Sequence, residues 1–130
     1  MATQKTKKRV LIVEDEPSLL ELYRLALEQA GFVVFTAVNG DAGYLLAKGN
    51  PVDLILLDIL MPKVDGYEAL RHLKNDPDTK EIPVIIFSNL SQKEEIEKGL
   101  KLGAKDFVVK TSVTPKALVE KVKQWVSGDV

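Results

Sequence analysis

The feature that most constrains this chain is an apolar run that ends in a carboxylate. Four consecutive apolar residues, Leu54 to Leu57, lead directly into Asp58, and Pro62 follows shortly after. A continuous apolar run bounded by turn residues is typical of a strand buried on both faces of a parallel sheet. Ligands of open α/β sheets bind at the carboxyl ends of the strands. The position of Asp58 therefore indicates a reactive group; the alternative is an aspartate that caps the next turn.

Length and composition limit the classes of protein to which the chain can belong. Its 130 residues suit one domain, which we expect over residues 9–128 behind a basic arm at 1–8. The formal net charge of -1 gives no basic footprint for nucleic acid. The absence of cysteine excludes disulfides and thiolate metal sites. No apolar run approaches the roughly 18 residues of a membrane span. We expect a cytoplasmic protein with no nucleic-acid or membrane partner.

Strand and helix patterns alternate along the chain. Apolar or β-branched runs predict strands at residues 10–13, 32–37, 54–57, 82–87 and 106–109. Helices are expected to begin at Pro17, after a cap at Asp41, at Asp65, after a cap at Ser91, and at Thr114. Five such units predict a doubly wound, flavodoxin-like (βα)5 fold of the α/β class. Its parallel sheet should have the strand order 2-1-3-4-5.

Polar residues follow four of the expected strands: Glu14 and Asp15, Asp58, Ser88, and Lys110. In the expected order the first and third strands are neighbours, so their carboxylates must lie close together, and either raised pKa values or a cation would relieve their repulsion. Carboxylate oxygens without histidine or cysteine suit Mg²⁺ better than Zn²⁺. We expect Asp15 and Asp58 as direct ligands, the Leu60 carbonyl as a third, and Glu14 acting through water.

A carboxylate beside a bound cation can act as a nucleophile and form an acyl phosphate. Lys110 would supply a second positive charge to a phosphoryl group, and the Ser88 hydroxyl a hydrogen-bond donor. Taken singly, a solvated surface lysine and a turn serine are the more common interpretations. Their coincidence at one sheet edge favours phosphoryl chemistry.

In these motifs the chain resembles the receiver domains of two-component response regulators, a family that includes the CheY-like chemotaxis regulators. The matching residues are 13–16, 57–66, 87–89 and 103–110. The resemblance implies that Asp58 accepts a phosphoryl group from a histidine kinase or phosphotransfer protein. It also implies that Glu14 and Asp15 hold Mg²⁺ and that Ser88 and Lys110 bind the phosphoryl group. Phe107 falls on the family's switch aromatic, which reshapes the face formed by the last two helices and the fifth strand.

Several positions depart from the family's usual pattern. Thr111 follows the lysine, where the family usually has proline, often after a cis peptide bond, so we expect a trans bond and a differently shaped loop. Ile59 and Leu60 follow the acceptor and, with Leu90, could shield an acyl phosphate from water, which predicts slow self-dephosphorylation. The only tryptophan, Trp125, lies far along the chain from the acceptor, so fluorescence would report phosphorylation poorly.

Two functions from different classes are open. The first is a stand-alone phosphoacceptor that is not an enzyme beyond Mg²⁺-dependent self-phosphorylation and autodephosphorylation, and that is a monomer or a phosphorylation-dependent dimer. The second is a scaffold domain that binds partners without phosphate. A phosphatase is disfavoured because Leu60 occupies the position where such enzymes carry an acid-base aspartate. His72, the only histidine, is expected at the surface and not as a phosphodonor.

Overall fold

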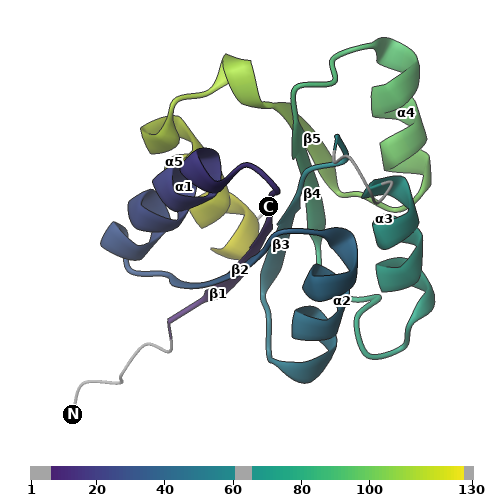
Figure 1. The fold of residues 1–130 in the computed structure, drawn as a ribbon, viewed down its shortest axis with the longest axis horizontal. Helices are drawn as coiled ribbons and strands as arrows, with labels where there is room; N and C mark the ends of the chain where they lie inside the picture. The colour runs from purple at the N-terminus through teal and green to yellow at the C-terminus, as the bar shows by residue number, and fades with distance from the viewer. Residues whose placement is uncertain (1–6, 61–65, 128–130) are drawn as a thin grey trace.

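A computed structural model describes residues 7–60 and 66–127, and it contains a five-stranded parallel sheet with helices on both faces (Figure 1). The strands are β1 (Arg9–Val13), β2 (Val33–Ala37), β3 (Leu54–Leu57), β4 (Val84–Ser88) and β5 (Asp106–Val109). The helices are α1 (Pro17–Gln29), α2 (Gly40–Gly49), α3 (Gly66–Asn75), α4 (Lys93–Lys101) and α5 (Pro115–Ser127), and η1 (Lys110–Ser112) is a 3-10 turn. The strand order β2-β1-β3-β4-β5 confirms the predicted fold.

Some sequence predictions lie outside the described residues. They concern most of the basic arm, the start of the third helix at Asp65, the motif residues 61–65 and the last expected residue of the domain.

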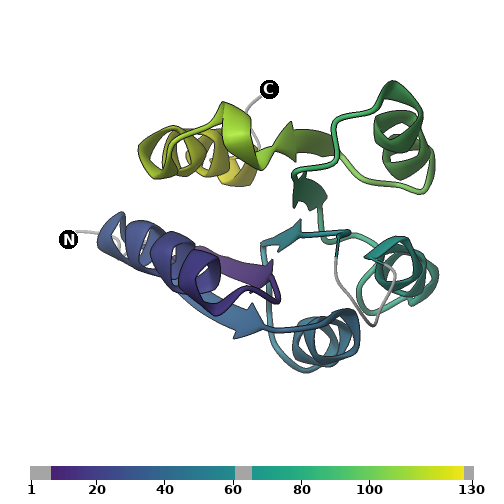
Figure 2. The ribbon, with the colours of Figure 1, turned by 45° about the horizontal axis from the view of Figure 1, so that its top comes forward.

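The central strand β3 explains why its sequence is continuously apolar. Ile55 and Leu57 pack into the core shared with α2, α3 and α4, whereas Leu54 and Leu56 pack into the core shared with α1 and α5. Figures 1 and 2 show these two groups of helices on opposite faces of the sheet. Because successive side chains of a strand point to opposite faces, a strand covered on both sides needs apolar residues at every position.

The helix ends confirm some of the predicted signals. Pro17 is the first residue of α1, and Gly31 after it has a φ of 100°, a backbone conformation that favours glycine. Thr114 caps α5, because its Oγ1 accepts a hydrogen bond from the Ala117 backbone N–H at 3.0 Å.

Two predicted caps are wrong. Asn39, not Asp41, caps α2: the Asn39 Oδ1 accepts from the Ala42 N–H at 2.8 Å, and Asp41 lies inside the first turn. Ser91 does not cap α4, which begins after Gln92 without a side-chain cap hydrogen bond. In each case a second polar residue lies within two positions of the predicted cap, and the sequence pattern alone does not choose between them.

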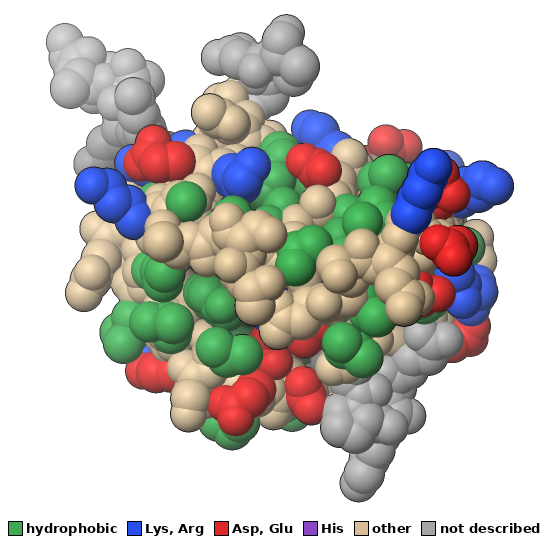
Figure 3. Space-filling model, turned by 90° about the horizontal axis from the view of Figure 1, so that it is seen from above, with side chains coloured by type: hydrophobic (Ala, Val, Ile, Leu, Met, Phe, Trp, Pro, Cys, Tyr) green, Lys and Arg blue, Asp and Glu red, His purple; other side chains and the backbone are tan. Residues whose placement is uncertain are grey.

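The surface carries charges of both signs. On the face seen from above, acidic and basic side chains lie among hydrophobic ones (Figure 3). Large apolar side chains that stay exposed include Leu45 on α2 and Leu60 just after Asp58. Within the described ranges, no helix has both the length and the apolar character that crossing a bilayer requires.

Gly66, the first residue of α3, packs closely against Ile59, the residue after Asp58. A Cβ at this position would lie 2.2 Å from the Ile59 Cα, an atom that cannot move without displacing the backbone next to Asp58. We predict that Gly66→Ala lowers the free energy of unfolding, measured by urea denaturation, by about 1–3 kcal/mol.

Gly49→Ala is the matched control, because nothing lies within 4 Å of a Cβ at that position in α2. This substitution should be neutral or stabilising by up to about 1 kcal/mol, since alanine favours helix. Equal unfolding free energies for the two variants would contradict the close approach.

Candidate functional site

Three carboxylates meet at the carboxyl edge of the sheet, as predicted. Val13 of β1 pairs with Leu57 of β3, so the residues that follow these two strands emerge side by side. Glu14, Asp15 and Asp58 each offer an oxygen, and these oxygens all lie within 4.8 Å of one another. The set combines two buried carboxylates with a half-buried one, since Glu14 is 2% exposed and Asp58 5% exposed.

Lys110 reaches this cluster from the end of β5, an edge strand that β4 separates from β3. It is the first residue of η1, after β5, and its ammonium donates hydrogen bonds to Asp58 Oδ2 at 2.7 Å and to Glu14 Oε1. The residue is only 7% exposed, so it is not the solvated surface lysine that its type alone would suggest. The described residues contain no cis peptide bond. The Lys110–Thr111 bond is therefore trans, as expected.

Burial and pairing act in opposite directions on these groups. Burial raises the pKa of Glu14 above its usual value, although the hydrogen bond from Lys110 works against the rise. Burial tends to lower the pKa of Lys110, but the hydrogen bonds to Asp58 and Glu14 outweigh it, so the pKa is raised. Lys110 is therefore a cation at neutral pH, and it offsets the charge of the carboxylates.

The carboxylates differ in how many donors they already have. Both oxygens of Glu14 are engaged, one by Lys110 and the other by the Glu16 backbone N–H at 3.0 Å. Asp58 accepts from Lys110 and from the Leu60 backbone N–H at 2.9 Å. Within residues 7–60 and 66–127, no group donates a hydrogen bond to the Asp15 carboxylate. Asp15 is thus the carboxylate with the most free capacity for a cation.

Ser88 lies at the same edge of the sheet. It is the last residue of β4, fully buried, and it pairs in register with Val109, the residue before Lys110. Its Oγ accepts a long hydrogen bond of 3.4 Å from the Leu90 N–H. The structure therefore brings the predicted hydroxyl, ammonium and carboxylates to one edge.

The hydrophobic residues that follow Asp58 divide between the core and the surface. Ile59 is 5% exposed and belongs to the core that α2 and α3 cover. The close packing of Gly66 against Ile59 holds it there. Leu60 is 53% exposed and Leu90 is half-buried, so these two residues are the more accessible members of the predicted shield.

Phe107, the predicted switch aromatic, is half-buried on β5. Its ring packs at the margin of the same core, and a Cβ at Gly99 of α4 would lie 3.6 Å from it. The ring therefore lies against α4.

A doubly wound α/β sheet whose carboxyl edge gathers three carboxylates and a buried lysine defines the class of response-regulator receivers. The family model described as "Response regulator receiver domain" matches residues 10–123, and the chain belongs to this family. Receiver domains are signalling domains of two-component systems and not classical enzymes.

Two curated relatives and one solved structure illustrate the range of similar proteins. Protein PilH of Pseudomonas aeruginosa is 37% identical over 92% of this chain and 98% of its own length. The DNA-binding dual master transcriptional regulator RpaA of Synechocystis is 39% identical over 78% of this chain. The structure described as the BeF3-activated DrrB receiver domain is 29% identical, covers 94% of this chain and 99% of its own, and has a TM-score of 0.77.

The share of each relative that is matched differs widely. The chain spans only 42% of RpaA, and about half or less of several other curated regulators that it matches.

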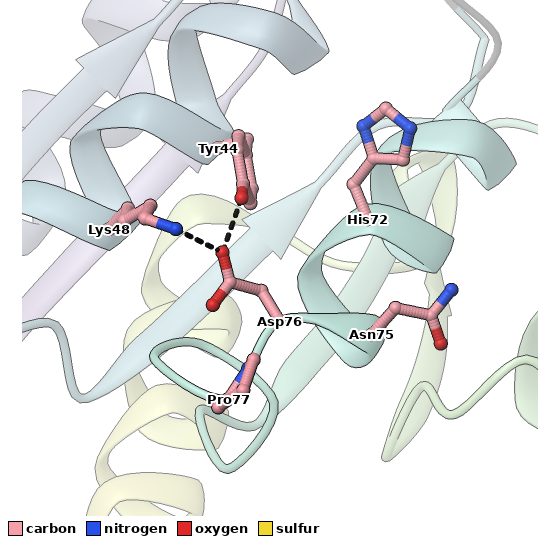
Figure 4. A pocket seen from close by; sticks show the side chains of 6 residues that line it. All are labelled: Tyr44, Lys48, His72, Asn75, Asp76 and Pro77. Carbon is pink, nitrogen blue, oxygen red and sulfur yellow. Dashed lines mark hydrogen bonds and ion pairs between the residues drawn. The ribbon is translucent and has the colours of Figure 1, made fainter.

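A second polar cluster, between α2 and the end of α3, was not predicted. Asp76 is nine-tenths buried and accepts hydrogen bonds from the Tyr44 hydroxyl and from Lys48 Nζ at 2.7 Å (Figure 4). It also accepts one from the Asp78 backbone N–H at 2.8 Å. In the sequence, Asp76 lies in a polar stretch at 75–78, which does not indicate burial. The spacing of Tyr44 and Lys48, one helical turn apart, was the available signal.

Tyr44, Lys48, Asp76 and His72 are among the residues that line a hollow of about 540 Å³. The exposed His72 ring packs edge-on against the Tyr44 ring, with 5.9 Å between the ring centroids. The surface position predicted for His72 is confirmed. Because Tyr44 and Lys48 both donate to Asp76, the cluster satisfies its own polar groups and ties α2 to α3.

The hydrogen bonds from Lys48 and Tyr44 lower the pKa of Asp76 from 3.8 to about 2. A carboxylate with a lowered folded-state pKa stabilises the fold fully above its ordinary pKa, and the contribution is lost as pH falls through the folded value. We predict that Asp76→Asn is less stable than the wild type at neutral pH, and that the difference shrinks between pH 3.8 and about 2.

Denaturant unfolding at a series of pH values measures this difference. Asp78→Asn is the control, because the Asp78 side chain is 65% exposed and lies 3.8 Å from Lys48. It should change stability little at any pH. A wild-type advantage over Asp76→Asn that is independent of pH would contradict the assignment.

Proposed function

We propose that the chain is a phosphoacceptor receiver domain in which Asp58 takes a phosphoryl group from a histidine kinase or phosphotransfer protein. The observation that carries the proposal is the buried Lys110 ammonium, 2.7 Å from Asp58, beside two further carboxylates. Buried charge placed around one reactive group is typical of sites that stabilise a transferring phosphoryl group. The similarity to a receiver domain activated by beryllium fluoride supports the same proposal.

In the transfer, a carboxylate oxygen of Asp58 attacks phosphorus and forms a new P–O bond. The P–N bond of the donor phosphohistidine breaks and its electron pair stays on the imidazole nitrogen; the imidazole leaves neutral because its other ring nitrogen carries a proton or because it takes one from solvent. Lys110 is already aligned with one Asp58 oxygen, so it can hold the transferred group without a large movement. Ser88 lies at the same edge to donate its hydroxyl proton to a phosphoryl oxygen.

The carboxylates fit a magnesium ion, which would add positive charge at the edge and help to position the phosphoryl group. With all three carboxylates ionised, Lys110 leaves an excess of two negative charges, which a divalent cation would balance. We assign Asp15 and Asp58 as direct ligands with the Leu60 carbonyl. Glu14 acts through water, because Lys110 and the Glu16 N–H already engage both of its oxygens.

We further propose that phosphorylation is read at the face formed by α4, β5 and α5, which lie together at one end of the sheet (Figure 1). Ser88 would be drawn toward the phosphoryl group, and Phe107 would turn inward. α4 suits such a movement for two reasons. Gly99 is the only buried residue of this helix, and no side-chain hydrogen bond caps its start. The proposed readout of this state is binding of a downstream protein.

Phosphorylation of Asp58 is tested with Mg²⁺ and a small phosphodonor such as acetyl phosphate. We predict an added mass of about 80 Da, the size of one phosphoryl group, and its complete loss in Asp58→Asn. Asp41→Asn, an exposed aspartate of α2, is the control and should keep the adduct. Intact-protein mass spectrometry measures all three proteins. Failure of the wild type to gain mass or to bind beryllium fluoride would instead favour the phosphate-independent scaffold.

The lifetime of the acyl phosphate should depend on the hydrophobic residue beside it. We predict a half-life of many minutes for the wild type, shortened by up to roughly tenfold in Leu60→Gln, which corresponds to about 1.4 kcal/mol on the barrier to hydrolysis. Leu45→Gln, at another exposed leucine on α2, is the control. Loss of the adduct from purified phosphoprotein gives the rates. Rapid loss in the wild type, or equal lifetimes in all three proteins, would contradict shielding by Leu60.

A further inference from the structure

A hydrogen bond connects the two loops that carry Ser88 and Lys110. The Asn89 Oδ1 accepts from the Thr111 backbone N–H at 3.2 Å, across 22 positions of sequence. Each partner is the residue that directly follows a predicted site residue, Ser88 in one loop and Lys110 in the other. Both partners are exposed, so the contact lies at the surface of the edge, next to the buried site residues.

The turn that begins at Lys110 has little else to fix it. η1 spans only three residues, and its closing hydrogen bond, from the Val113 N–H to the Lys110 carbonyl, is long at 3.4 Å. The first N–H groups of a helical turn have no partner inside the turn, and a nearby side chain usually satisfies them. Val109, the residue before the turn, provides no such side-chain bond. Asn89 supplies it from the end of a different strand.

This contact bears on where the Lys110 ammonium can lie. β4 separates β5 from β3, so the Lys110 side chain must reach past the end of β4 to contact Asp58. The direction in which it leaves the backbone is set by the turn that starts at Lys110. Asn89 fixes that turn relative to the end of β4.

We infer that Asn89 is a positioning residue that keeps the Lys110 turn in register with Ser88, so that ammonium and hydroxyl converge on one phosphoryl group. The inference rests on the proposed phosphoacceptor function and adds to it a residue that acts through two others. Movement of the Ser88 loop after phosphorylation is also transmitted through Asn89 to the Lys110 turn. A proline at position 111 has no N–H and cannot make this contact.

A double-mutant cycle on the full chain tests the inference. Asn89→Ala, Thr111→Pro and the double variant are compared with the wild type for phosphorylation by acetyl phosphate in saturating Mg²⁺. Asn89→Ala should lower the maximal rate by about twofold to tenfold, the range expected for one hydrogen bond, with the half-saturating donor concentration unchanged. In the Thr111→Pro background the same substitution should have no effect, because the donor is already gone. Asn75→Ala, at an exposed asparagine of α3, is the control.

Amide hydrogen exchange of Thr111 provides a readout that does not depend on phosphate. The amide should be protected in the wild type, exposed in Asn89→Ala, and protected again in Asn89→Asp, which keeps the accepting oxygen. Two results would overturn the inference alone. In the first, the wild type gains the phosphoryl group and Asn89→Ala reacts at the same rate. In the second, Asn89→Ala lowers the rate equally in the wild-type and Thr111→Pro backgrounds. A wild type that gains no phosphoryl group, despite a protected Thr111 amide, would overturn the proposed function.

Discussion

The pairing of one buried ammonium with carboxylates from two strands is the interaction on which the edge of this sheet depends. A lysine removed from water is stable only where opposite charges and hydrogen bonds replace its hydration, and Glu14 and Asp58 do so for Lys110. The dependence is mutual, because carboxylates this close together repel unless a cation lies among them. Lys110 thus connects the ends of β5, β3 and β1.

Backbone packing delivers the carboxylates to this position. The parallel register of β1 and β3 sets Glu14 beside Asp58. Close helix approach then fixes the backbone on either side. A Cβ on Gly43 of α2 would lie 2.6 Å from Val13, the residue before Glu14, and Gly66 of α3 packs on Ile59, the residue after Asp58. Gly43, which costs α2 some helix propensity, therefore makes room for the end of β1.

The sequence predicted what depends on topology and missed what depends on side-chain direction. Parallel strands bring their carboxyl ends together regardless of detail, so the grouping of Asp58 with Lys110 followed from strand order. The position of Ile59 in the core was not predicted, because it depends on the direction in which this side chain leaves the backbone. The burial of Asp76 was missed because its two side-chain donors come from α2, a helix distant in sequence. Contacts of that kind depend on how two helices pack, which no local pattern specifies.

The lysine–aspartate clusters around Asp76 and Asp58 differ in their balance of donors and acceptors, and the difference separates a structural site from a proposed reactive one. At Asp76, three donors converge on one carboxylate, so both of its oxygens are already hydrogen-bonded within the fold. At the sheet edge three carboxylates lie together, and the Lys110 ammonium pairs with only two of them, Glu14 and Asp58. That edge is short of positive charge, so a divalent cation would stabilise it. In the proposed function, a phosphoryl group on Asp58 would supply acceptor oxygens for Lys110 and Ser88. The unbalanced charge at the edge is therefore the physical reason for assigning phosphoryl acceptance to Asp58 and a structural role to Asp76.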